Sequence, residues 1–106
     1  MSFDIDQVLK DMAGAITGTV QQGAGDIQSY LKEILDKEKE SLKELAEARL
    51  RNEITDEELK QELEREKKVV EAQLLTIEIM TKALAQKAVN AAMDVFIKAI
   101  KAAVTL

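Results

Sequence analysis

The feature that most constrains this chain is the absence of helix-breaking residues over most of its length. The sequence has no proline, and its four glycines all lie between Gly14 and Gly25. From Asp26 onward, no residue interrupts a helix through its backbone chemistry. Strong helix formers dominate, while alternating β-branched residues and Asn-Gly turns are missing. The sequence therefore predicts an all-α fold.

A first helix is expected over residues 4–22, at the start of a single helical domain that spans residues 1–106. Its apolar residues recur at spacings of three and four, which predicts one buried stripe. The stripe consists of Ile5, Val8, Leu9, Met12, Ile16 and Val20. The glycines of 23–25 then mark a break, and Asp26 is a candidate N-cap for a second helix over 26–51.

The clearest local signal lies just after that second helix. Thr55 and Glu58 have the spacing of a capping box, and Ile54 and Leu59 occupy the positions of a hydrophobic staple. We therefore expect a turn at 52–55 and a third helix that begins at Asp56. No helix breaker follows, so this helix is expected over 56–104, and about fifty residues would make a rod of roughly 75 Å.

The second helix is too short to cover such a rod alone, which leaves two arrangements open. In one, the first helix extends beyond the glycine break and lies beside the C-terminal half, with Met12 near Phe96 and Val8 near Ile100. In the other, it folds back or reaches into another chain. The lengths favour an elongated antiparallel helical hairpin with a short N-terminal helix, whose charged turn near Asn52 lies far from its apolar end.

The C-terminal helix carries more apolar surface than one neighbouring helix can cover. Leu63, Val70, Ile77, Leu84 and Ala91 repeat every seven residues, which is typical of a coiled-coil-like seam. A second apolar set lies off that seam, so a partner is implied. We expect a homo-oligomer, most simply a dimer, that assembles into a helical bundle. The expected oligomer interface comprises Val8, Met12, Ile16, Leu84, Ala88, Ala91, Ala92, Val95, Phe96 and Ala99.

Three functional hypotheses follow. The first is a self-associating helical scaffold or interaction protein. The second is an adaptor or chaperone-like module that binds an amphipathic helix of a partner protein in a groove. The third is a peripheral membrane-surface binder that presents Lys87, Lys98 and Lys101 to lipid headgroups, although Asp94 lies on the same narrow polar strip.

The composition argues against an enzyme. Histidine, cysteine and tryptophan are absent, which removes the commonest general base, the thiol nucleophiles and the preferred transition-metal ligands. No catalytic residue, cofactor or metal site is therefore expected, and Glu58, Glu62 and Glu66 are interpreted as a solvated acidic face. The formal net charge of -5 argues against nucleic-acid binding. A cytoplasmic location is expected because no signal-peptide pattern is visible.

Overall fold

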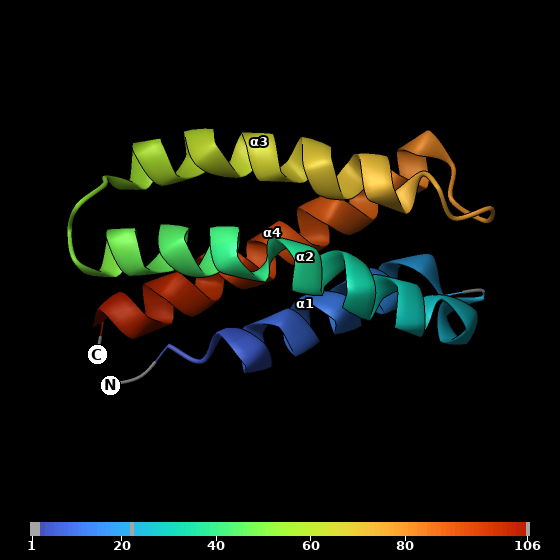
Figure 1. Ribbon diagram of the computed structural model, residues 1–106, viewed down its shortest axis with the longest axis horizontal. Coiled ribbons are helices and arrows are strands. Elements are labelled where there is room, and N and C mark those ends of the chain that lie inside the picture. The colour runs from blue at the N-terminus through green and yellow to red at the C-terminus, as the bar shows by residue number, and fades with distance from the viewer. Residues whose placement is uncertain (1–2, 22, 106) are drawn as a thin grey trace.

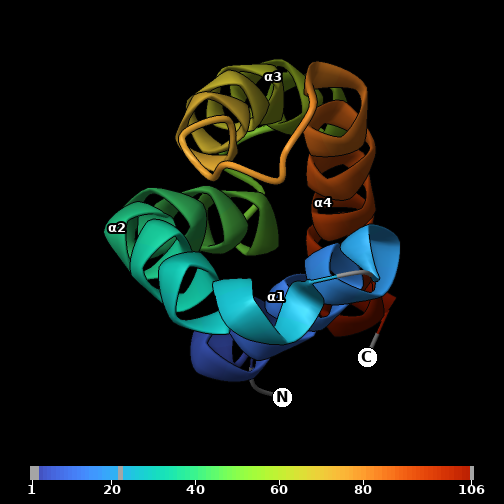
Figure 2. The ribbon, with the colours of Figure 1, turned by 90° about the vertical axis from the view of Figure 1, so that its right-hand side faces the viewer.

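The computed structural model describes residues 3–21 and 23–105, and these residues form an antiparallel bundle of four helices (Figure 1). The helices are α1 (Ile5–Val20), α2 (Ala24–Leu50), α3 (Asp56–Leu74) and α4 (Lys82–Thr105). Viewed along the bundle, each helix packs beside the next, and α4 returns to lie against α1 (Figure 2). The all-α prediction is confirmed, and no helix in the described part of the chain is long and apolar enough to cross a membrane.

The first helix forms as its sequence pattern predicts. The carboxylate of Asp4 caps it by accepting hydrogen bonds from the backbone N–H groups of Asp6 and Gln7, at 3.1 and 3.2 Å. The helix ends before Gln21, which has a positive φ of 59°. All members of its predicted apolar stripe are buried. They face mainly α4, which agrees with the expectation that the first helix lies beside the C-terminal half.

The second helix begins earlier than the sequence indicates. Its N-cap is Gly23, which has a φ of 78°, so Asp26 lies inside the first turn and does not cap the helix. Glycine tolerates this left-handed conformation without the steric cost of a Cβ atom. The chain therefore turns back sharply at Gly23, and α2 runs antiparallel to α1 (Figure 1).

The capping box at the start of α3 is confirmed. The backbone N–H of Glu58 donates to Thr55 Oγ1 at 3.1 Å, and the backbone N–H of Thr55 donates to Glu58 Oε1 at 2.9 Å. Arg49 Nε donates to Asp56 Oδ1 at 2.6 Å, which ties the end of α2 to the start of α3. This ion pair and hydrogen bond lower the pKa of Asp56, and Lys101 adds to the effect.

The expectation of one unbroken helix over 56–104 is wrong. The chain leaves the helix after Leu74 and re-enters it at Lys82. In between, Thr76 Oγ1 donates to the carbonyl of Gln73 at 2.6 Å, and Thr81 Oγ1 accepts from the N–H of Leu84 at 3.2 Å. These side chains end one helix and start the next without a proline or glycine.

Packing energy explains why the break is favoured. Residues 76, 77, 79 and 81 are β-branched. The helix propensity of each is about 0.5 kcal/mol less favourable than that of alanine, so little free energy is lost when this segment leaves the helix. Folding α4 back buries Met93, Phe96 and Ile100 almost completely. Burial of one such side chain is worth about 1.5–3 kcal/mol. The tertiary gain therefore exceeds the local helical loss.

The overall shape is correspondingly shorter than the expected hairpin. The Cα atoms extend over 40 × 23 × 19 Å, which replaces the expected rod of roughly 75 Å. The end of α4 lies at the same end of the bundle as the turn between α2 and α3 (Figure 1). The apolar and charged ends of the predicted hairpin are therefore not separated as expected.

Candidate interaction surface

The residues predicted to form an oligomer interface lie in or beside the core of the single chain. Six of them are buried: Val8, Met12, Ile16, Ala88, Ala92 and Phe96. The other four are half-buried: Leu84, Ala91, Val95 and Ala99. The structure therefore brings the two predicted segments together, but it does so within one chain through the packing of α1 on α4.

Phe3 contributes to this contact although the sequence pattern gives it no role. Its ring meets the buried ring of Phe96 edge to face, with centroids 6.2 Å apart and an interplanar angle of 78°. This geometry is a preferred one for aromatic pairs. Phe3 precedes α1 and therefore lies outside the helical stripe that the spacing analysis detects.

A different surface remains open, between α1 and α2. A groove of about 550 Å³ runs between these helices, and we call it the α1–α2 groove. Its floor is apolar and is formed by Leu9, Leu31 and Leu35, which are themselves almost fully buried. Its other lining residues are Asp6, Lys10, Ala13, Gly14 and Thr17 from α1 and Gln28, Lys32 and Asp36 from α2. The volume is within the range of small binding sites in proteins.

The charges along this groove are balanced. Two acidic residues, Asp6 and Asp36, and two basic residues, Lys10 and Lys32, line it. At one end, Lys39 Nζ lies 2.7 Å from Asp6 Oδ1 and joins the two walls. Its hydrogen bond and positive charge lower the pKa of Asp6, and the pKa of Lys39 is raised in return. The groove thus presents no net field that would favour a polyanion.

The glycines of α1 are not required by packing inside the chain. A Cβ atom built on Gly14 or Gly18 would meet no atom within 4 Å. The sequence pattern suggests that these glycines permit close approach of a neighbouring helix, but none of the described helices uses that space. Gly14 lines the α1–α2 groove and Gly18 does not. A helix seated in the groove would pass close to the backbone at Gly14.

A second depression of about 470 Å³ lies at the end of the bundle that holds the α1–α2 turn and the 75–81 loop. It is lined by Gly23, Asp26, Ile27, Tyr30, Thr76, Ile77, Glu78 and Ile79. Tyr30 and Ile79 are 55% and 45% exposed, and nearby Leu75 is 40% exposed. Three of the five exposed large apolar side chains among the described residues therefore lie at this end of the molecule.

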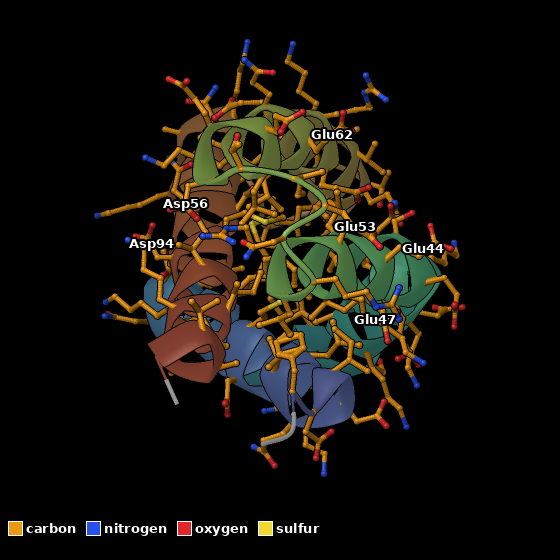
Figure 3. All side chains as sticks on the ribbon, turned by 90° about the vertical axis from the view of Figure 1, so that its left-hand side faces the viewer. Glu44, Glu47, Glu53, Asp56, Glu62 and Asp94 are labelled. Carbon is orange, nitrogen blue, oxygen red and sulfur yellow. The ribbon has the colours of Figure 1, made fainter. Side chains whose placement is uncertain are left out.

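The fold leaves little of the α4 surface suited to binding a membrane. Lys87, Lys98 and Lys101 are exposed on α4, but so is Asp94, which points away from the bundle (Figure 3). The main apolar face of α4 packs against the other helices. A surface-binding helix must insert such a face between lipid headgroups. In this fold that face is occupied.

The described residues contain no group of three or more histidine, cysteine, aspartate or glutamate side chains placed to hold a metal ion. One acidic residue nevertheless differs from its expected setting. Glu58 and Glu62 are exposed, as a solvated acidic face requires, but Glu66 is half-buried. Its Oε2 atom is shielded from solvent and has no hydrogen-bond partner among the described residues. The sequence signal for the partial burial of Glu66 is its position in the apolar stripe of α3, between Leu63 and Val70.

Comparison of the chain with models of protein families, with curated proteins and with solved structures gives no match.

Proposed function

We propose that this protein is a non-enzymatic helical interaction module that binds an amphipathic helix of a partner protein in the α1–α2 groove. The observation that carries the proposal is the combination of an apolar floor with charge-balanced walls along two antiparallel helices. Helix-in-groove recognition uses apolar side chains at spacings of three, four and seven residues. These would lie on Ala13 and Gly14, above the buried leucines of the floor. The proposal assigns the module to the cytoplasm.

The groove favours a partner helix over a second copy of the same groove. Small residues, Ala13, Gly14 and Thr17, form much of the α1 wall. If two copies of the protein packed groove against groove, these small side chains would leave the space between the two grooves unfilled. A partner helix with projecting leucines would fill the volume, and acidic and basic residues at its flanks would pair with Lys32 and Asp36.

The test uses a designed peptide as the probe. It is an amphipathic helix with leucines at helical spacing and equal numbers of Glu and Lys, compared with a peptide of the same composition and scattered leucines. We expect the first peptide to shift the backbone NMR signals of Gly14, Thr17 and Leu31 selectively. Equal effects of both peptides, or no preference for these signals, would contradict the proposal.

Two glycine variants provide a matched pair. In Gly14→Gln a long side chain enters the groove, while in Gly18→Gln it is added one turn away and outside the groove. Both replacements remove a helical glycine and should stabilise α1 by up to about 1 kcal/mol. We expect peptide binding to be lost only in Gly14→Gln. Retained binding in that variant would exclude the groove as the docking site.

Self-association is a second candidate, now through a different surface from the predicted one. It is favoured by the exposed apolar side chains Tyr30, Leu75 and Ile79 at one end of the bundle. In this proposal two bundles assemble into a dimer through helix and loop contacts at that end. Sedimentation equilibrium should then show a mass that rises with concentration, and Leu75→Glu with Ile79→Glu should abolish the rise. A constant monomer mass would contradict it.

A further inference from the structure

Two glutamates interrupt the apolar stripes of the adjacent helices α2 and α3. Glu38 lies between Leu35 and Leu42, and Glu66 lies between Leu63 and Val70, in both cases three residues after one and four before the other. All four flanking side chains are buried. Residues three and four apart share a helix face. Both glutamates therefore lie where α2 packs on α3, a contact that we call the α2–α3 seam.

The side chains around Glu66 leave its carboxyl group poorly compensated. Glu38 is its hydrogen-bonding neighbour from α2, and Arg65 and Glu62 act on it from α3. Arg65 is exposed and its Nη1 atom lies 3.8 Å from Glu62. On α2, Lys39 is paired with Asp6. The charged side chains of α4, which also packs on α3, are all exposed: Lys82, Lys87, Asp94, Lys98 and Lys101.

We propose that Glu66 is protonated when α2 and α3 are tightly packed, and that release of this proton to water loosens the α2–α3 seam. Both side chains are half-buried, and Oε2 of Glu66 is shielded from solvent without a hydrogen-bond partner among the described residues. An ionised Glu66 would be repelled by the negative charge of Glu38 across the seam. A protonated Glu66 carries no charge to be repelled, and its O–H can donate to a carboxylate oxygen of Glu38.

The direction of the pH dependence follows from the burial of the pair. Burial, followed by the hydrogen bond and negative charge of Glu38, raises the pKa of Glu66 from 4.5 to about 7. Between these two values the folded state binds a proton that the unfolded state has released. The resulting stabilisation is complete below pH 4.5 and is lost as the pH rises to about 7. The seam is therefore tighter in mildly acidic solution than above neutral pH.

Thermal unfolding at pH 5 and pH 8 tests this dependence. The other resolved pKa shifts, in Asp6, Asp56 and Lys39, act outside this interval because the two acids are shifted down from 3.8 and the lysine is shifted up from 10.5. We expect the melting temperature to be lower at pH 8 by roughly 4–8 °C, a shift of the size that one solvent-screened group produces in a domain of this length.

Glu66→Gln keeps the shape of the side chain but has no proton to lose. We expect its melting temperature to vary little between pH 5 and pH 8, and to exceed that of the unsubstituted protein at pH 8. Glu44→Gln is the control, because Glu44 lies on the outer side of α2 (Figure 3). It should retain the full pH dependence. If Glu66→Gln retains that dependence too, the proposal is overturned.

The carboxyl ¹³C signals in NMR provide a readout that a merely structural role would not affect. We expect the Glu66 signal to titrate near pH 7, together with the backbone amides of Leu42 and Leu63. Glu38→Gln removes the negative neighbour, so the Glu66 midpoint should fall. A midpoint at the ordinary glutamate value in the unsubstituted protein, or one that Glu38→Gln leaves unchanged, would overturn the proposal.

Discussion

Lys39 Nζ lies 2.7 Å from Asp6 Oδ1 and thereby joins the first turn of α1 to the middle of α2. The pair is exposed, with side-chain exposures of 34% for Lys39 and 69% for Asp6. Exposed ion pairs contribute little to the free energy of folding. Its position matters more than its strength, because it bridges the two helices at one end of the α1–α2 groove.

Replacing Lys39 tests the electrostatic part of this relationship. In Lys39→Met the hydrogen bond and the positive charge are lost, so the pKa of Asp6 should rise towards its ordinary value of 3.8. Because the Asp6 pKa is lowered in the folded protein, the contribution of the pair is present above pH 3.8 and is lost as the pH falls through the lowered value. A carboxyl ¹³C titration measures the change, and Lys37→Met, at an exposed position nearby, should leave Asp6 unaffected.

The capping box offers a prediction about stability. Thr55→Ala removes the oxygen that accepts the N–H of Glu58. We expect the free energy of unfolding, measured with urea, to fall by about 1 kcal/mol. Thr55→Ser keeps the acceptor oxygen and should lose much less. Equal losses in the two variants would show that the hydroxyl group does not cap α3.

The buried face of α4 offers another prediction about stability. Ala88 is fully buried, whereas Ala83 is exposed on the same helix. Ala88→Glu places an unpaired charge in the core and should cost several kcal/mol, enough to unfold a marginal domain. Ala83→Glu should fold normally. The circular dichroism signal separates the two outcomes, and a folded but dissociated Ala88→Glu variant would instead support the interface predicted from the sequence.

Local sequence signals predicted those parts of the fold that local forces determine. The apolar stripe from Ile5 to Val20 and the capping box at Thr55 depend on spacings within one turn or one helix, and both are confirmed. The break at 75–81 is not predicted by the helix-breaking residues, because this segment contains neither proline nor glycine. Thr76 and Thr81 carry the local signal for it, but their effect depends on the core that α4 gains by folding back.

The candidate surfaces were harder to predict for the same reason. The C-terminal segment carries the apolar surface that its sequence indicates, but the remaining helices of the chain cover most of it. The α1–α2 groove depends on how far two helices stand apart, which residue spacing within either helix does not determine. The Glu38 and Glu66 pair likewise requires the register of α2 against α3, although each glutamate visibly interrupts an apolar stripe.

The return of α4 along α3 distinguishes the four-helix fold from a long hairpin, and one distance between the two helices tests it. Lys60 of α3 and Lys101 of α4 line the same small cleft, and the sequence has no native cysteine, so Lys60→Cys with Lys101→Cys accepts two spin labels selectively. Labelled protein diluted into unlabelled protein should give an intramolecular distance well under half of the ~60 Å that an unbroken helix would impose. A distance close to ~60 Å would contradict the four-helix fold and restore the long hairpin.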